Sequence, residues 1–244
     1  AYDKGYIGHK SAKQMKRALH IELRIEDKLE EKKSLLKNVE DERKLKFSRD
    51  KISKEKLISV EKASLSFKGK KIFDNFSLDV FQGERVALTG DNGCGKTSLI
   101  KAIKKELCLD SGSICIPSLL EISYSNQIPS WDRGLLREHL KRENADETKF
   151  RSILGAMGAW GELFERPLET FSRGELKKVE LCKSFMYPGR LLIWDEPLNY
   201  LDIMSREQLE EVVLEFEPTL LFTEHDRVFV ENVASKIVVM SIEQ

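Results

Sequence analysis

The sequence lacks the features of a membrane or secreted protein. No apolar run approaches the about 20 residues that a membrane-spanning helix needs, and no signal peptide is visible. The four cysteines, Cys94, Cys108, Cys115 and Cys182, have no metal-binding spacing and indicate free thiols in a reducing compartment. We therefore expect a soluble, cytoplasmic protein with no transmembrane segment. Because residue 1 is alanine and not an initiator methionine, we also expect a fragment of a longer protein.

The chain also has no net charge, but its charged residues are unevenly distributed along the sequence. The chain has 41 basic and 41 acidic residues, so its total charge identifies no partner. Residues 1–56 hold 17 of the basic and 11 of the acidic residues. The stretch from Lys4 to Arg17 contains five basic residues and no acidic one. Such a patch suits a polyanion, although a solvated face is the ordinary alternative.

The first 50 residues are typical of a long basic helix. Residues 10–45 contain no proline or glycine and are rich in Lys, Glu and Leu. Apolar residues recur there at heptad spacing, interrupted by Glu22 and Lys32; they are Met15, Ala18, Ile25, Leu29, Leu36 and Val39. This pattern indicates a weak coiled-coil seam whose partner helix is outside this chain, and a single solvated helix is the alternative. We assign residues 1–50 to this helix and residues 51–244 to a globular domain.

From Leu57 onward, strand and helix patterns alternate, which predicts an α/β fold. Two strands at 57–67 and 71–80, joined by a turn at 68–70, predict an antiparallel β subdomain. After the strand at 85–90, we expect a helix with Leu99, Ile100, Ile103 and Leu107 on one face. Residues from about 132 to 170 predict a helical subdomain. The other expected elements are strands at 113–117, 121–125, 191–195, 219–223 and 236–240 and helices from Ser172, near 204–215 and from Asp226.

A glycine-rich loop follows the strand at 85–90 and fits the pattern G-x-x-x-x-G-K-[ST]. The residues are Gly90, Asp91, Asn92, Gly93, Cys94, Gly95, Lys96 and Thr97, followed by Ser98. The glycines let backbone N–H groups curl around a β-phosphate, Lys96 neutralises phosphate charge, and the Thr97 hydroxyl can bind Mg²⁺. We expect Cys94 to contribute only its backbone. The strand before the loop and the helix after it are the context that a nucleotide-binding P-loop requires, so the sequence predicts ATP and Mg²⁺ as ligands.

The apolar strand at 191–195 ends in Asp195 and Glu196. Alone, such a pair is usually only a strand end. Beside a P-loop, we expect Asp195 to hold the Mg²⁺ shell and Glu196 to polarise an attacking water.

The stretch FSRGE, residues 171–175, has two interpretations. Ser172 and Glu175 form the S-x-x-E pattern of a capping box at the start of a helix. The same Ser172 with Gly174, at the positive end of a helix, could instead bind a phosphate. The residues alone leave both interpretations open.

The order of these motifs resembles the ATP-binding-cassette (ABC) ATPase domain, a P-loop NTPase. The resemblance covers residues 57–240 and includes Phe67, GDNGCGKT, Gln127, FSRGE, LLIWDEP, LNYLD and Glu224-His225-Asp226. It implies that Phe67 stacks on adenine, that Gln127 senses Mg²⁺ and water, and that His225 faces the γ-phosphate. It also implies that Ser172, Gly174 and Glu175 belong to the signature loop and that residues 199–202 form the D-loop.

The resemblance further implies that two such domains stack head to tail. Each ATP then lies between the P-loop of one domain and the signature loop of the other, so Ser172 would contact ATP held by a partner domain. The signature loop departs from the family pattern, because Arg173 replaces a glycine and Glu175 replaces a glutamine. We expect the Glu175 carboxylate to fold back onto the helix cap. Without a partner or a homodimer, the fragment should hydrolyse ATP poorly.

Within the family, DEPLNYLD, HDRVF and the short region between Gln127 and Ser172 resemble the ABC-F branch. These proteins carry two cassettes joined by a helical linker and act on ribosomes, so residues 1–50 would be part of the linker and its basic charge would suit ribosomal RNA. DEPLNYLD with FSRGE resembles the Lsa and Vga type, which protects ribosomes from antibiotics. Two alternatives stay open: a transporter cassette whose membrane domains lie on another chain, and a non-catalytic domain that binds ATP only to fold.

Overall fold

The computed structural model describes residues 55–125, 129–159, 161–186 and 191–241, which belong to one unit, Ser53–Gln244. The expected basic helix at 1–50, with its heptad seam, lies outside the described residues. Gln127 also lies outside them. The division of the chain at residue 50 therefore stays a prediction.

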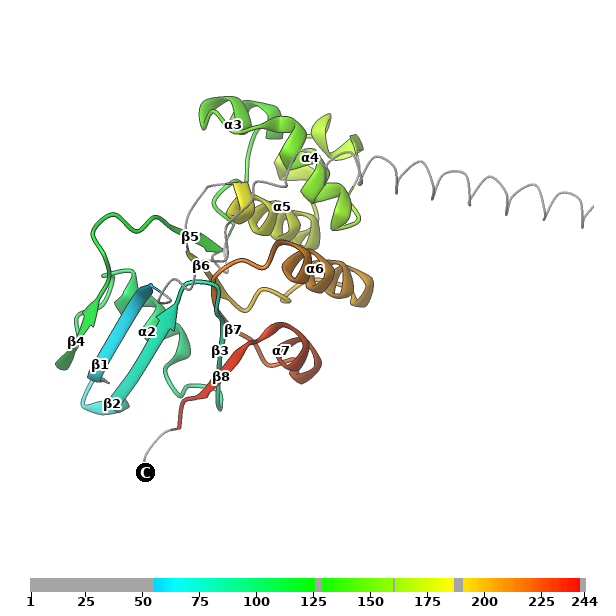
Figure 1. The fold of residues 1–244 in the computed structure, drawn as a ribbon. Coiled ribbons are helices and arrows are strands. Elements are labelled where there is room, and N and C mark those ends of the chain that lie inside the picture. Colours follow the sequence, from blue (N-terminus) through cyan, green and yellow to red (C-terminus); the bar gives the residue numbers. More distant parts are fainter. Residues whose placement is uncertain (1–54, 126–128, 160, 187–190, 242–244) are drawn as a thin grey trace, which may run out of the picture. The chain divides into compact units, whose positions relative to one another are not determined.

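A three-stranded antiparallel sheet has the order β2-β1-β4 (Figure 1). Its strands are β1 (Lys56–Phe67), β2 (Lys70–Phe81) and β4 (Ser111–Cys115). Lys68 and Gly69 connect β1 to β2 with positive φ angles of 50° and 79°. A two-residue turn with positive φ angles at both positions matches the right-handed twist of the paired strands, which explains the tight connection. The hairpin expected from the sequence is confirmed.

A five-stranded parallel sheet has the order β5-β6-β7-β3-β8. Its strands are β3 (Arg85–Thr89), β5 (Ile122–Ser125), β6 (Leu191–Asp195), β7 (Leu220–Thr223) and β8 (Lys236–Val239). All five residues of β6 are buried, as a central parallel strand requires. Because the strands are parallel, their carboxyl ends meet at one edge, where Asp195 pairs with Thr223 in the register. In open α/β sheets, ligands bind at this edge.

Alternate side chains of the parallel sheet enter two different cores. Ile193 and Leu221 pack with the antiparallel sheet and with Leu99, Ile100 and Ile103 of α2 (Lys96–Ile103). Trp194 and Phe222 pack in the other core, against the helices α5 (Arg173–Met186), α6 (Ile203–Phe216) and α7 (Arg227–Val233). The two-residue period of a strand therefore gives each face of the sheet its own cover (Figure 1).

The segment expected to be helical contains α3 (Leu136–Arg142), α4 (Glu147–Ala156) and two 3₁₀ turns, η1 (Gly161–Phe164) and η2 (Leu168–Thr170). Helix α4 packs against both α5 and α6. Asp146 caps α4, since its side chain accepts hydrogen bonds from the N–H groups of Thr148 and Lys149.

The sequence pattern predicts that α2 continues to Leu107, and this prediction is wrong. The helix ends at Ile103, and Leu107 is exposed. Lys105 adopts a left-handed conformation with φ of 61°, and the N–H of Glu106 donates to the carbonyl of Lys101. These are features of a helix C-terminus, which the apolar spacing alone did not reveal.

Candidate functional site

The P-loop connects the carboxyl end of β3 to the start of α2. Gly90 and Gly95 have φ angles of 140° and 102°, a region that side-chain-bearing residues rarely adopt. A Cβ at Gly95 would also lie 2.7 Å from Ile72 and 2.8 Å from Phe73 of β2. The loop therefore packs tightly against the antiparallel sheet. Because α2 begins at Lys96, its free N–H groups lie at the loop, which is the arrangement that binds phosphate.

Lys96 is held inside the loop. Lys96 is only 6% exposed. Its ammonium donates hydrogen bonds to the carbonyls of Gly90 (2.8 Å) and Asp91 (3.1 Å). The ammonium is thus placed across the loop, where it can meet phosphate oxygens. Cys94 is fully buried, in agreement with the expectation that its side chain does not face a ligand. Asp91 and Asn92 are exposed, and Ser98 is half-buried.

Asp195 and Thr97 meet at the edge of the parallel sheet. The Thr97 hydroxyl donates to Asp195 Oδ1 over 3.3 Å. The hydroxyl of Thr223 donates to the same oxygen over 2.7 Å. Asp195 is 8% exposed, so these hydrogen bonds fix a nearly buried carboxylate. Two oxygen donors, Thr97 Oγ1 and the Asp195 carboxylate, suit Mg²⁺, which takes one or two protein ligands beside phosphate oxygens and water.

Glu196 lies directly after β6 with a φ angle of 49°. Its N–H donates to Thr223 Oγ1 (3.0 Å), so one threonine holds both Asp195 and Glu196. The carboxylate accepts a hydrogen bond from Asn199 Nδ2 (2.6 Å), and His225 Nε2 lies 3.8 Å from its other oxygen. The structure therefore brings the predicted catalytic residues Glu196 and His225 together.

A buried carboxylate, Glu224, connects the chain just before the D-loop to the loop that carries His225. One of its oxygens accepts from the N–H of Leu198 (3.1 Å) and the other accepts from the N–H of His225 (2.7 Å). Glu224 is 6% exposed, so this connection is shielded from water. It holds the backbone two residues after Glu196 next to the backbone of His225.

The signature loop is a complete capping box. The Glu175 carboxylate accepts from the Ser172 N–H (2.7 Å), and the Glu175 N–H donates to the Ser172 hydroxyl oxygen (3.2 Å). The predicted fold-back of Glu175 is therefore confirmed. Arg166 lies 3.4 Å from the same carboxylate. Partial burial raises the pKa of Glu175, but the hydrogen bonds with Ser172 and the charge of Arg166 outweigh it, so the pKa lies below its ordinary value.

The signature loop contacts the D-loop of the same chain. A Cβ at Gly174 would lie 2.8 Å from the Tyr200 carbonyl oxygen, so a glycine is needed for this approach. The Arg173 guanidinium lies over the Tyr200 ring, 5.4 Å from its centre. The two departures from the family pattern thus have partners inside this chain, Tyr200 for Arg173 and Arg166 for Glu175.

Phe67, the predicted adenine platform, stands at the end of β1 and is 64% exposed. The Lys68 ammonium lies 5.5 Å from its ring centre, on the ring face. An aromatic ring this exposed, at the end of a hairpin, can stack on a base. Gln127 lies outside the described residues, so its predicted role stays a prediction.

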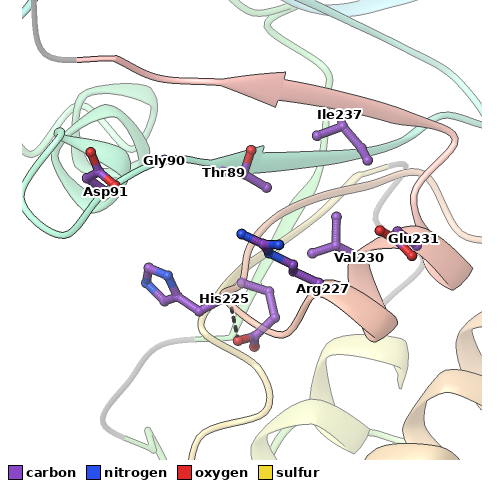
Figure 2. Close-up of a pocket in the computed structure, with 9 residues that line it drawn as sticks. Thr89, Gly90, Asp91, His225, Arg227, Val230, Glu231 and Ile237 are labelled. Atoms are coloured by element: carbon purple, nitrogen blue, oxygen red, sulfur yellow. Dashed lines mark hydrogen bonds between the residues drawn. The ribbon is translucent and has the colours of Figure 1, made fainter.

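A cavity of about 430 Å³ lies between the start of the P-loop and α7 (Figure 2). Thr89, Gly90 and Asp91 line one side, and His225 and Arg227 line the other. Figure 2 shows Arg227 extending from α7 toward the strand that ends at Thr89. Gly90 and Asp91 of the P-loop and His225 line the same cavity, so the P-loop and the His225 loop face one open region.

Sequence reasoning missed several residues that organise the site. The sequence indicates only that Thr223 ends a strand, although Thr223 directly precedes the Glu224-His225-Asp226 motif. Arg166 lies outside every motif, and nothing in its neighbourhood pointed to Glu175.

Among the described residues, no helix is long and apolar enough to cross a bilayer.

Comparisons with known proteins identify the family of this chain. The model of the family described as "ABC transporter" matches residues 73–199. A Haemophilus influenzae protein named "ATP-binding protein Uup-like" is 34% identical over 193 residues, 74% of this chain and 41% of that protein. "ABC transporter F family member 5" of Arabidopsis thaliana is 29% identical over 205 residues, 80% of this chain and 29% of that protein. The chain thus spans less than half the length of these relatives.

A solved structure described as "Structure of ATP binding subunit of ABC transporter" has the same fold. It superposes with a TM-score of 0.63 and 25% sequence identity, over 75% of this chain and 85% of that one. The family model, these relatives and the P-loop geometry agree with one another. The chain belongs to the ABC transporter family, as an ATP-binding-cassette ATPase domain with ABC-F proteins among its relatives.

Proposed function

We propose that this cassette hydrolyses Mg-ATP in a composite site, formed by its own P-loop and the signature loop of a second cassette. The observation that carries the proposal is the geometry of the signature loop. Ser172 is exposed, Glu175 is folded back and paired with Arg166, and the start of α5 is ordered by the cap. The loop therefore offers a hydroxyl and helix N–H groups to a phosphate, with its own carboxylate neutralised.

Within one chain, the two halves of such a site sit on different structural elements. The P-loop precedes α2, which packs on β6, whereas the signature loop precedes α5, which packs on α4 and β5. The described contacts of the signature loop are with Arg166 and Tyr200. We infer that the signature loop serves ATP held by another cassette, either the first cassette of a longer protein or a second copy of this chain.

On the P-loop side, Lys96 would bind β- and γ-phosphate oxygens in place of its present carbonyl partners. Thr97 and Asp195 would hold Mg²⁺, and Gln127 would approach the same ion. The metal supplies charge neutralisation of the phosphates. Phe67 would stack on the adenine, and the backbone of residues 90–98 would surround the phosphates.

Glu196 would orient and polarise the attacking water. Asn199 holds one of its carboxylate oxygens, and His225 lies 3.8 Å from the other oxygen. His225 would face the γ-phosphate, and its backbone is fixed by Glu224. Since the P-loop side lacks the partner's signature loop, an isolated chain should bind ATP but turn it over slowly.

The biological setting we propose is a cytoplasmic ABC-F protein that acts on ribosomes. The sequence similarity to Uup and to ABC-F members supports the branch. The basic residues between Lys4 and Arg17 support contact with ribosomal RNA. Two ATP molecules would close the cassette pair on the ribosome, and hydrolysis would open it.

A more specific proposal is antibiotic resistance by ribosome protection. It rests on the DEPLNYLD and FSRGE motifs. Bacteria that express the complete gene encoding this chain should show higher inhibitory concentrations for lincosamides, streptogramin A or pleuromutilins. Unchanged values for all three classes would reject this proposal and leave the ATPase proposal intact.

The central experiment compares ATP binding and ATP-driven closure in three variants. Lys96→Ala should abolish ATP binding, because the loop loses its cation. Glu196→Gln should bind ATP, hydrolyse it at least tenfold more slowly, and accumulate a dimer in Mg-ATP that gel filtration detects. Lys101→Ala, an exposed lysine on the same helix, should behave as the parent. A Glu196→Gln protein with parental hydrolysis would contradict the assignment of the base.

The alternative is an ATP-binding subunit of a transporter, which the similarity to a solved transporter subunit favours. Ribosome sedimentation distinguishes the two settings. The full-length Glu196→Gln protein should sediment with ribosomes in Mg-ATP, and salt should release it if phosphate contacts dominate. Co-purification with a membrane subunit, without ribosomes, would favour the transporter.

A further inference from the structure

The signature loop carries a positive charge that no ion pair within the described residues offsets. The Arg166 guanidinium lies 3.4 Å from the Glu175 carboxylate, so these two charges compensate each other. Arg173 is exposed and follows Ser172 directly, at the first position of α5. Across the described parts of the chain, its side chain makes no hydrogen bond and no ion pair. The loop therefore presents an unpaired guanidinium beside the hydroxyl that the proposed function assigns to ATP.

This guanidinium is restrained by Tyr200 of the D-loop. Its Cζ atom lies over the face of the Tyr200 ring, 5.4 Å from the ring centre. The backbones of the two loops are also close, since a Cβ at Gly174 would lie 2.8 Å from the Tyr200 carbonyl oxygen. A cation–π contact attracts the charge of an arginine without occupying its N–H groups in hydrogen bonds. The five N–H donors of Arg173 thus stay available to a ligand.

A guanidinium in this position suits a phosphate group. Its N–H groups form a planar fork that can pair with two oxygens of one phosphate, whereas a lysine supplies only a point charge. The nearest carboxylate of the loop does not compete for the fork. Glu175 accepts from the Ser172 N–H over 2.7 Å and pairs with Arg166. The two departures from the family pattern therefore act together, because the fold-back of Glu175 leaves the charge of Arg173 free.

We propose that Arg173 is a catalytic residue supplied in trans, whose guanidinium donates hydrogen bonds to the γ-phosphate of the ATP held by the partner cassette. In the hydrolysis, water attacks the γ-phosphorus, and its proton passes to the base of the cassette that holds the ATP. The bond from the γ-phosphorus to the oxygen that bridges it to the β-phosphorus breaks, which gives ADP and inorganic phosphate. A cation beside the γ-phosphate stabilises the negative charge that moves during this step. The inference rests on the proposed composite site.

The test uses this chain as a homodimer in Mg-ATP, because one copy then supplies the P-loop and the other supplies Arg173. Arg173→Gln removes the charge and keeps a side chain of good helix propensity. Arg142→Gln, which changes an exposed arginine in the last turn of α3, is the matched control. For each protein, thermal unfolding checks the fold and calorimetry measures the Kd of ADP, which lacks the γ-phosphate. Phosphate release measures the turnover of Mg-ATP.

We expect Arg173→Gln to bind ADP with a Kd within about twofold of the parent, because its P-loop is intact, and to hydrolyse ATP at least about tenfold more slowly. An arginine supplied in trans is worth about 10³–10⁵-fold in GTPases, and the remaining Ser172 and N–H contacts reduce the loss here. Arg173→Lys should recover only part of the rate, because an ammonium forms no fork. Arg142→Gln should match the parent. Parental turnover in Arg173→Gln overturns the inference.

Mixing two variants separates a direct role in trans from a structural role within one chain. An Arg173→Gln chain keeps its own base, and a Glu196→Gln chain keeps Arg173, so only a mixed dimer joins the two at one ATP. The mixture should give a fast first phase of phosphate formation in Mg-ATP that neither variant gives alone. A chain with both Arg173→Gln and Glu196→Gln should not restore this phase to the Arg173→Gln chain. Absence of a fast phase in the first mixture, or its presence in the second, refutes a role in trans.

A control on assembly keeps the inference apart from the proposed function. If parental turnover per chain does not rise with chain concentration, the isolated chain does not dimerise, and the full-length protein replaces it. There, Arg173→Gln changes one of the two composite sites and should lower the amplitude of the fast first phase by about half. An unchanged amplitude overturns the inference. A parent that binds no ATP overturns the proposed function itself.

Discussion

Replacing Thr223 by valine is the sharpest test of how the site is held. Valine has nearly the same shape as threonine, but it lacks the hydroxyl. In the structure that hydroxyl donates to Asp195 Oδ1 over 2.7 Å and accepts from the Glu196 N–H over 3.0 Å. Thr223 is fully buried, so water cannot replace either contact. The substitution thus removes one anchor from the Asp195 carboxylate, the predicted Mg²⁺ ligand, and one from the backbone of Glu196, the predicted base.

The expected loss of stability follows from these contacts. A hydrogen bond to a charged group contributes about 1.5–3 kcal/mol. Two contacts limit the damage, because Asp195 keeps its bond from Thr97 at 3.3 Å and the Glu196 N–H also donates to the Thr223 carbonyl at 3.2 Å. We therefore expect a loss of about 2 kcal/mol. For a domain of 150–250 residues, that lowers Tm by about 4–8 °C.

Thr223→Ser is the matched control, because it keeps the hydroxyl and loses one buried methyl group. Its cost should be about 1 kcal/mol from lost burial and a small cavity. Thermal unfolding followed by circular dichroism should therefore rank the parent first, the serine variant second and the valine variant last. Hydrolysis should fall in the valine variant more than in the serine variant, while ATP binding by the P-loop persists. A valine variant at least as stable as the serine variant would refute the reasoning.

Three further predictions concern the loops around this site. Gly174→Ala should lower Tm by about 2–4 °C, because a methyl group there would clash with the Tyr200 carbonyl. The clash should cost about 1–3 kcal/mol, which exceeds the gain in helix propensity. Gly161→Ala, with open space around it, should leave Tm unchanged. The ionised Glu175 stabilises the folded protein at pH values above its unfolded pKa of about 4.5, and this stability is lost as the pH falls through the lower folded pKa. Between pH 7 and pH 3, the urea midpoint should therefore fall less in Glu175→Gln than in the parent. Midpoints that fall in parallel in the two proteins would contradict this. Asp146→Ala should cost about 1 kcal/mol in thermal unfolding and Asp146→Asn much less, because only the cap is lost; equal losses would contradict the cap.

The sequence predicted the parts of the site that are local. The P-loop, the end of β6 and the cap of α5 each lie within ten consecutive residues, and their chemistry follows from residue type and spacing. The strands were also predictable, since apolar runs such as residues 191–195 can only be buried. The fold-back of Glu175 was predictable for the same reason: its partner Ser172 is three residues away.

Contacts between distant residues could not be predicted in this way. Thr223 meets Asp195 across 28 positions, and Ser130 meets Glu180 across 50. Nothing near either residue in the sequence specifies its partner, because the pairing depends on strand order and on which helix covers which face. The prediction that α2 extends to Leu107 failed for a related reason, because the end of this helix depends on backbone geometry and not on apolar spacing.

The signature loop shows why motif departures need the surrounding fold before they can be judged. A carboxylate at Glu175 should repel a phosphate, and this alone would suggest a weak half-site. In the structure the carboxylate faces the Ser172 N–H and Arg166, so its charge is already compensated within the chain. The Ser172 hydroxyl oxygen accepts from the Glu175 N–H, and the Ser172 side chain is exposed and accessible to a ligand. The strength of the half-site therefore depends on Arg166, a residue that belongs to no motif and becomes relevant only when the chain is folded.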